Sequence, residues 1–151
     1  MQHGIGQFCT REVVTVGPAT TVVEACELMR KHHVGAVVVV EDTERGKLPL
    51  GVLTDRDVAV EVVALRIDAT TLKVGEVVQR PVTTIRADAG YAETVRLMSV
   101  NGVRRMPVVT DEGILVGIIT VDDILRQLAG PLVALSDLVA RERHFEQSTR
   151  R

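Results

Sequence analysis

The chain has 151 residues, of which 46% are hydrophobic and 25% charged, and its formal net charge at pH 7 is −2. This composition is ordinary for a globular protein, and the length fits one domain or two closely packed halves. With this weak negative charge, one Tyr, two Phe and no Trp, the chain lacks the basic surface and stacking rings of nucleic-acid binders. We therefore do not expect a nucleic acid as partner.

The sequence also predicts no membrane contact. No stretch reaches the roughly 18 apolar residues that a membrane-spanning helix needs. Residues 1–7 lack the basic and apolar regions of a signal peptide. The two cysteines, Cys9 and Cys26, form neither a CxxC motif nor a disulfide framework. We expect a cytoplasmic location.

The first half of the chain predicts the order strand, helix, strand, strand, helix. The elements are a strand at 13–16, a helix from about 22, a strand at 37–40, a charged loop at 41–47, a strand at 50–53 and a helix at 55–65. Thr21 and Glu24 have the spacing of a capping box at the start of the first helix. The helix at 55–65 is apolar on nearly every side, so we expect a second copy of the chain to cover it in a homodimer.

The second half predicts the same order again. Its elements are a strand at 82–85, a helix at 91–100, strands at 106–109 and 115–119 and a helix at 122–128. Gly130 and Pro131 are expected to end the last helix, before an amphipathic helix at 132–146 and a frayed tail at 147–151. The predicted units are repeat 1 at 9–66, a linker at 67–79, repeat 2 at 80–130 and a C-terminal helix and tail at 131–151.

The two halves are internal repeats of one another. Residues 11–16 align with residues 80–85 at a shift of 69 positions, and Met29 aligns with Met98. After a loop that is three residues longer in the first copy, the shift becomes 66. A repeat of this kind indicates two copies of one structural unit.

Each copy contains the motif Gly-apolar-x-Thr-x-x-Asp where a strand turns into a helix: Gly51, Thr54 and Asp57 in the first, and Gly117, Thr120 and Asp123 in the second. A helix start carries unpaired N–H groups and a partial positive charge, which suit a phosphate. The Thr hydroxyl could add a donor, and the Asp could accept from ribose hydroxyls. The alternative is a capping box that only starts the helix. Two copies in matching contexts favour the nucleotide.

Four strings in this order resemble a tandem pair of CBS domains, the Bateman module. They are Val34–Val39, Gly51–Asp57, Val103–Val108 and Gly117–Asp123, and the resemblance covers residues 9–130. It implies an α+β fold of two β-α-β-β-α repeats packed with pseudo-two-fold symmetry, followed by a C-terminal helix. It also implies a regulatory role, because such pairs typically bind adenosyl ligands in clefts between the repeats and modulate an attached or separate effector protein.

The ligands implied by this resemblance are AMP, ADP, ATP, NAD or S-adenosylmethionine, with no other cofactor required. The threonines of the motif would contact phosphate or ribose, the aspartates would hold the ribose, the first strands would flank the base, and two arginines would bind phosphate. The ligand-contacting residues implied are Thr15, Val16, Val37, Thr54, Arg56, Asp57, Thr84, Ile85, Arg104, Arg105, Met106, Pro107, Thr120, Asp122 and Asp123.

The two predicted clefts differ in their basic residues. Arg104 and Arg105 of the second copy align with Gly35 and Ala36 of the first. We therefore expect the second cleft to bind a phosphorylated ligand more tightly. The first cleft could borrow Arg105 from across the cleft, use Arg56, take a less charged ligand or stay empty.

The sequence contains no motif for catalysis. It has no GxxxxGK[ST], no GxGxxG after a strand and no GxSxG. His32 and His33 have no third ligand at metal spacing, so no metal site is expected, although the motif aspartates could hold Mg²⁺ beside a nucleotide. We therefore expect a ligand sensor rather than an enzyme. The alternatives are an interaction subunit with non-functional clefts and an enzyme acting on a nucleotide.

Overall fold

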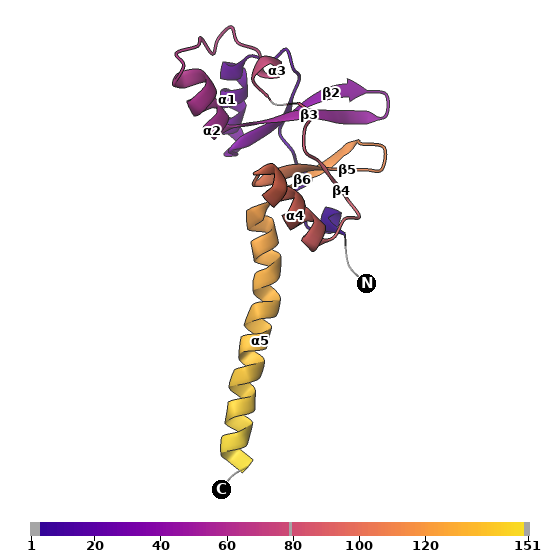
Figure 1. Cartoon of the computed structure of the whole chain (residues 1–151), viewed down its shortest axis with the longest axis vertical. Coiled ribbons are helices and arrows are strands. Elements are labelled where there is room, and N and C mark those ends of the chain that lie inside the picture. Colours follow the sequence, from indigo (N-terminus) through magenta and orange to yellow (C-terminus); the bar gives the residue numbers. More distant parts are fainter. Residues whose placement is uncertain (1–3, 79, 150–151) are drawn as a thin grey trace.

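The computed structural model describes residues 4–78 and 80–149. It contains two three-stranded sheets, one in each repeat, with strand orders β1-β2-β3 and β4-β5-β6. The strands are β1 (Thr15–Val16), β2 (Ala36–Thr43), β3 (Gly46–Thr54), β4 (Ile85–Arg86), β5 (Arg105–Val109) and β6 (Leu115–Thr120). The first sheet packs on the second through β3, which contacts β5 and β6. Figure 1 shows the two sheets next to each other.

The helices complete the predicted order in each repeat. They are α1 (Val22–His32), α2 (Asp55–Asp57) with its π-helical continuation η2 (Val58–Val63), α4 (Tyr91–Asn101) and α5 (Val121–Thr149), together with the short η1 (Ile5–Gln7) and α3 (Val74–Val77). The capping box of α1 is formed, since Thr21 N donates to Glu24 Oε2 at 2.8 Å. The predicted α+β fold of two β-α-β-β-α repeats is therefore confirmed.

The pseudo-two-fold symmetry extends to the register of the strands. In each sheet the first strand is parallel to the second, with Val16 opposite Val39 and Ile85 opposite Val108. The second and third strands are antiparallel. Their register shifts directly after Val39 in the first sheet and directly after Val108 in the second. Buried valines and isoleucines of these strands form one core under each sheet.

Each repeat completes its core with a segment from outside its own strands. The element η1 precedes repeat 1 but packs on repeat 2, where Ile5 N donates to Ala89 O at 2.8 Å. The element α3 precedes repeat 2 but packs on repeat 1, where Val74 N donates to Thr20 O at 2.8 Å. Ile5 and Val74 are both 0% exposed. We call η1 and α3, with the residues that follow each up to 10 and 78, the exchanged segments.

The glycine of the repeated motif allows the exchanged segments to pass close to the sheets. A Cβ on Gly51 would lie 2.7 Å from Val78 Cβ, and a Cβ on Gly117 would lie 2.8 Å from Thr10 O and against Cys9 Sγ. Beside Gly117, Thr10 and Ile118 exchange two backbone hydrogen bonds of 2.9 Å. This glycine therefore has a packing role in both repeats, because only a residue without a Cβ fits there.

The charged segment at 41–47 is not the loop that the sequence predicted. It is the end of a hairpin, in which β2 runs to Thr43 and β3 begins at Gly46. Thr43 Oγ1 donates to Gly46 O at 2.7 Å, and Gly46 takes a φ of +136°, which favours glycine. The last three residues of β2 are exposed. Charged residues fit this part of the hairpin because its side chains reach water.

Gly130 and Pro131 do not end a helix, so this prediction was wrong. The helix α5 runs without interruption from Val121 to Thr149 and projects from the body of the molecule (Figure 1). Pro131 has no N–H to bond the carbonyl of Gln127, and its ring crowds that same carbonyl. Leucines and alanines on both sides favour helix strongly enough to continue through this gap. The tail is helical through residue 149 rather than frayed from 147, and residues 150–151 lie outside the described residues.

The apolar helix after β3 leaves much of its surface uncovered. Val62 is fully buried, but Val60, Val63 and Leu65 are 47%, 66% and 61% exposed. The chain itself therefore covers one side of η2 only. None of the described helices is both long enough and apolar enough to cross a membrane.

The close approach at Gly117 predicts a sharp sensitivity to one methyl group. Gly117→Ala should lower the free energy of unfolding by about 1–3 kcal/mol, because the Cβ would overlap the exchanged segment. Gly130→Ala is the matched control, since no atom lies within 4 Å of its added Cβ, and it should raise stability by about 0.5–1 kcal/mol. Urea unfolding midpoints measure both changes. Equal midpoints for Gly117→Ala and wild type would contradict the packing role.

Candidate functional site

The two copies of the motif lie at equivalent turns on neighbouring strands. Thr54 ends β3 and begins α2, and Thr120 ends β6 and begins α5. In the sheets, Ala36 is opposite Thr54 and Arg105 is opposite Thr120. Because β3 and β6 contact each other, the two turns follow neighbouring strands from different repeats.

Both turns form capping boxes, so the structural interpretation of the motif holds in each copy. Thr54 N donates to Asp57 Oδ2 at 2.9 Å, and Asp57 N donates to Thr54 Oγ1 at 3.0 Å. Thr120 N and Oγ1 donate to Asp123 Oδ2 at 3.0 and 2.8 Å, and Asp123 N donates to Thr120 Oγ1 at 3.2 Å. These bonds fix the aspartates on the first turn of each helix.

Each aspartate still has a second carboxylate oxygen. Asp57 Oδ1 accepts no hydrogen bond from any residue that the structure describes, while Asp123 Oδ1 lies 3.5 Å from Arg126 Nη1. Asp57 is half-buried, and the side chain of Asp123 is 15% exposed. A ligand hydroxyl can therefore donate to Oδ1 of either aspartate without breaking the capping box.

The first N–H groups of α2 are already used within the protein. Asp55 N donates to Gly35 O at 3.0 Å, Arg56 N to Asp55 Oδ1 at 2.8 Å and Asp57 N to Thr54 Oγ1 at 3.0 Å. At the start of α5, Val121 N donates to Arg104 O at 2.9 Å. Sequence reasoning treated these groups as free phosphate donors, but the side chains that cap the helices compete for them.

The two arginines lie at different helix starts. The backbone of Arg104 holds the first N–H of α5, so this exposed residue lies beside the turn of its own repeat. Arg105 is half-buried, and its Nη1 lies 3.6 Å from the point where a Cβ on Gly35 would be. Gly35 in turn bonds the first N–H of α2. The guanidinium of Arg105 therefore reaches from repeat 2 to the turn of repeat 1.

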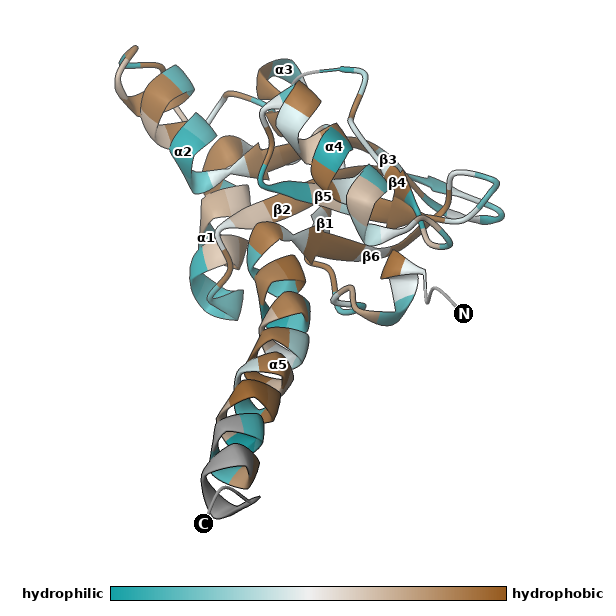
Figure 2. Ribbon diagram, turned by 60° about the horizontal axis from the view of Figure 1, so that its bottom comes forward, coloured by the Kyte–Doolittle hydropathy of each residue, from teal (hydrophilic) through white to brown (hydrophobic). Residues whose placement is uncertain are grey.

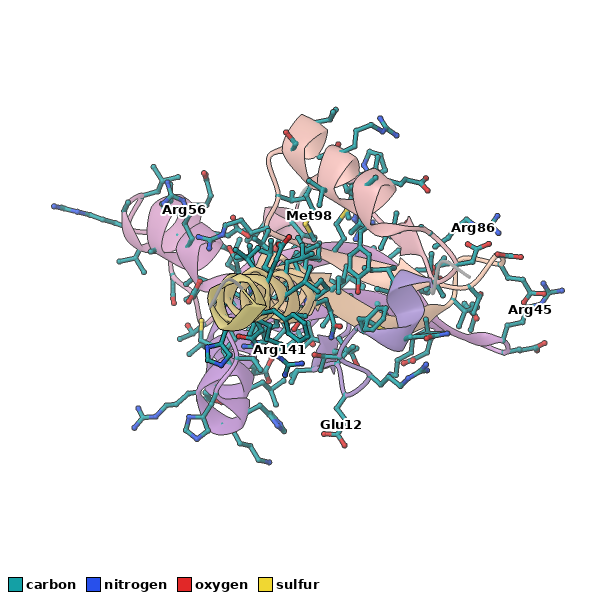
Figure 3. All side chains as sticks on the ribbon, turned by 90° about the horizontal axis from the view of Figure 1, so that it is seen from below. Glu12, Arg45, Arg56, Arg86, Met98 and Arg141 are labelled. Carbon is teal, nitrogen blue, oxygen red and sulfur yellow. The ribbon has the colours of Figure 1, made fainter. Side chains whose placement is uncertain are left out.

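Five of the predicted ligand residues contribute their side chains to the core. They are Val16, Val37, Ile85, Met106 and Pro107, and all are buried. Thr15 and Thr84 are half-buried, while Arg56 and Asp122 are exposed at equivalent positions on the first turns of α2 and α5. Figure 3 shows Arg56 at the edge of the molecule opposite Arg86 and Arg45.

Neither thiol is activated as a nucleophile. Burial raises the pKa of Cys9, and burial also raises the pKa of Cys26, so both are protonated at neutral pH. Within the described residues, no three His, Cys, Asp or Glu side chains gather as they would around a metal ion.

An open depression of about 520 Å³ lies away from both turns. Its lining residues are Arg45, Ala87, Asp88, Thr110, Asp111, Glu112 and Ile114. Arg86 pairs here with Asp88 at 2.8 Å and with Asp111 at 2.7 Å, and Arg45 pairs with Glu112 at 3.9 Å. The sequence did not predict this feature, because its residues come from one hairpin tip in each repeat and from the segment after β4. It contains none of the predicted ligand residues.

The chain belongs to the CBS-domain family. The family model matches twice, at residues 5–64 and 74–130, so the protein is a tandem CBS pair. The two matches begin at the exchanged segments, at Ile5 and Val74. The CBS pair is a regulatory module and not a catalytic one.

Several curated proteins are similar over most of the chain. It is 35% identical to Hypoxic response protein 1 of Mycobacterium tuberculosis over 77% of this chain and 78% of that protein. It is 38% identical to the CBS domain-containing protein YhcV of Bacillus subtilis over 76% and 78%. It also matches an uncharacterized Methanopyrus kandleri protein (MK0525) at 36% identity over 81% of this chain, but it spans only 61% of that relative's length.

Solved structures show the same fold. The chain is 32% identical to a crystal structure of Hypoxic Response Protein I with two coordinated zinc ions, with a TM-score of 0.71, over 82% of this chain and 97% of that one. It is 25% identical to the CBS pair of protein MJ0100 in complex with 5-methylthioadenosine and S-adenosyl-L-methionine (TM-score 0.72; 87% and 99%). It is 33% identical to the cytosolic domain of the Mg²⁺ channel MgtE in complex with ATP (0.68; 82% and 48%).

The capping boxes predict that the charge and the structural role of Asp57 can be separated. Asp57→Asn keeps an oxygen that can accept from Thr54 N, so its unfolding midpoint without ligand should stay close to that of wild type. Asp57→Ala removes the acceptor and should cost about 1 kcal/mol or more. Urea unfolding measures both. If Asp57→Ala is as stable as Asp57→Asn and wild type, the capping box contributes nothing to folding.

Proposed function

We propose that the protein senses an adenosyl nucleotide in two clefts, one beside the start of α2 and one beside the start of α5. The observation that carries this proposal is that each turn has an aspartate whose Oδ1 lies outside the capping box, with an arginine nearby; Oδ1 of Asp123 also lies 3.5 Å from Arg126 Nη1. The solved relatives that hold ATP, methylthioadenosine or S-adenosylmethionine support the ligand class. The response passes to an effector protein, and a cytoplasmic location remains a prediction.

In each proposed cleft, one residue binds the ribose and another binds the phosphate. Asp57 and Asp123 accept hydrogen bonds from ribose hydroxyls through Oδ1. Phosphate binding falls to the arginines, because the first N–H groups of α2 are already bonded within the chain. A guanidinium presents two parallel donors that match phosphate oxygens, which makes Arg suitable for this role.

The position of Arg105 favours one arginine for each cleft. Its Nη1 lies beside Gly35, whose carbonyl accepts from Asp55 N at the turn of repeat 1, whereas Arg104 lies beside the turn of repeat 2. Gly35 leaves space there because it has no side chain. We therefore infer that repeat 1 takes its phosphate-binding group from repeat 2. This arrangement reduces the difference in affinity that the sequence predicted between the clefts, and it couples the two repeats through the ligand.

The regulated state is proposed to be a homodimer. The exposed side of η2 carries Val60 and Val63, Leu65 follows shortly after, and all three are between 47% and 66% exposed. Burying such a surface against a second copy would stabilise the dimer by roughly 25 cal/mol for each Å² of apolar area removed from water. One of the similar solved structures is a hexameric CBS-CP12 protein, which supports assembly as a property of this family.

The alternative is an interaction subunit whose clefts bind no nucleotide. The capping boxes favour this alternative, because their hydrogen bonds already use the threonines and one oxygen of each aspartate. Calorimetry with AMP, ATP, NAD and S-adenosylmethionine separates the two functions, because an interaction subunit gives no binding heat with any of them. Chromatography of each mixture after incubation tests catalysis, since a sensor leaves the nucleotide unchanged.

The arginine assignment predicts a selective loss of phosphate binding. Arg105→Ala should weaken AMP binding by about ten- to a hundredfold, which corresponds to a charged hydrogen bond of roughly 1.5–3 kcal/mol. The weakened site should be the one that Asp57→Asn also affects, and adenosine affinity should not change. Arg104→Ala should act instead on the site affected by Asp123→Asn.

Isothermal titration of AMP and adenosine measures these effects. Arg86→Ala is the control, because Arg86 pairs with Asp88 and Asp111 far from both turns. If Arg105→Ala weakens the Asp123 site and spares the Asp57 site, the proposed borrowing is wrong.

The dimer surface has its own prediction. Val63→Glu should lower the average mass in light scattering at a given concentration, because it places a charge in the apolar patch. Val133→Glu is a matched control on α5, with a side chain of similar exposure, 61% against 66%. If Val63→Glu has the same average mass as wild type, η2 is not the dimer surface.

A further inference from the structure

The helix α5 presents the largest group of exposed apolar side chains that the nucleotide clefts do not explain. Ile124 is its buried anchor, packed near β6, and every residue from 125 to 142 is exposed. Figure 2 shows hydrophobic residues continuing along the helix well beyond the body. The exposed ones, between 46% and 65% accessible, are Leu125, Leu128, Leu132, Val133, Leu135, Leu138 and Val139. A stripe of this length in water indicates an uncovered contact surface.

Five of these residues form a regular seam. Leu125, Leu128, Leu132, Leu135 and Val139 follow one another at intervals of three, four, three and four residues. We call these five residues the α5 seam. Such a spacing averages 3.5 residues and keeps one line of side chains facing a second helix, as in a coiled coil. The spacing therefore indicates that the surface covering α5 is itself a helix.

The residues beside the seam favour a second copy of the same helix. Partner choice between paired helices is usually set by charges at the flanking positions. Here these positions hold Ala129 and Ser136 on one side and Pro131 and Leu138 on the other. They contain no charge that would select a foreign helix or repel an identical one. Pairing of two copies also covers both seams at once.

The charged residue at the end of the seam sets the orientation. Glu142 occupies the position that follows Val139 in the seam. A parallel pair would place the two Glu142 carboxylates against each other, which is unfavourable. An antiparallel pair places Glu142 opposite Leu125 of the partner, next to the partner's Arg126, and opposes the two helix dipoles favourably. It also brings Pro131 near Leu138 of the partner, so apolar residues flank the seam.

We propose that α5 pairs with α5 of a second copy in an antiparallel arrangement centred between residues 133 and 134. In this pair Leu132 lies opposite Leu135 and Leu128 lies opposite Val139. A 29-residue helix is about 43 Å long at 1.5 Å per residue, so the two bodies lie at opposite ends of the pair. The seam is only two heptads long, so the association depends on concentration. This surface is separate from η2 and from the nucleotide clefts.

The first experiment is sedimentation velocity across a range of concentrations. Leu132→Glu should shift self-association to at least tenfold higher concentration, because it places a charge in the centre of the seam. Val133→Glu is the matched control, since Val133 is equally exposed but lies off the seam, and it should associate as wild type does. Equal association of both variants with wild type would overturn the proposal, and so would a contact made with some other helix or with the chain's own body.

The second experiment tests the orientation by disulfide formation, with the linked cysteines identified by peptide mass spectrometry. Leu128→Cys and Val139→Cys proteins are oxidised separately and then as a mixture. The antiparallel pair predicts 128–139 links only in the mixture, because 128 and 128 of two copies are about 16 Å apart along the axis. Links of 128 to 128 in the separate sample indicate a parallel pair and overturn the proposal, as does the absence of α5 links in every sample. The native Cys9 and Cys26 serve as internal controls for random links.

Discussion

The reciprocal exchange of short segments between the repeats is the constraint on which the rest of the structure depends. Ile5 fills the core of repeat 2 and Val74 fills that of repeat 1, so neither core is complete with its own strands alone. Each exchanged segment then crosses the sheet that it joins beside Gly51 or Gly117. A residue with a side chain at either glycine would push the crossing segment away. The motif glycine thus serves folding first and the cleft indirectly.

The proposed clefts depend on this arrangement. The repeats contact each other through β3 and β6, so the starts of α2 and α5 come from neighbouring strands. Arg105 can then extend from its own strand to Gly35 in the other repeat. A ligand held by Asp57 and Arg105 would contact both repeats, so its binding free energy would depend on how the repeats are packed. Such a dependence is what a regulatory module needs in order to transmit occupancy.

The sequence predicted the repeat, the order of elements and the capping box of Thr21 and Glu24, because these signals are local. For the two copies of the Thr-x-x-Asp motif, a capping box was the alternative to a nucleotide site. The pairing of Thr21 with Glu24 and of Thr54 with Asp57 needed only spacing. The exchange was missed because its signals are single apolar residues, Ile5 and Val74, whose partners lie far away in sequence. The path of Arg105 depends on the packing of two sheets, which no local pattern encodes. The prediction that Gly130 and Pro131 end a helix was wrong, because strong helix formers on both sides outweigh this local stop signal.

The most direct test of the account is a backbone NMR titration of the protein with AMP. The proposed clefts predict that the amide signals of residues 54–57 and 120–123 shift with AMP concentration, because their side chains meet the ribose. The amides of the equivalent capping segment at residues 21–24, which has the same local structure but no cleft role, should not move. Shifts confined to other regions, or equal shifts at residues 21–24, would contradict the claim that these two helix starts bind the nucleotide.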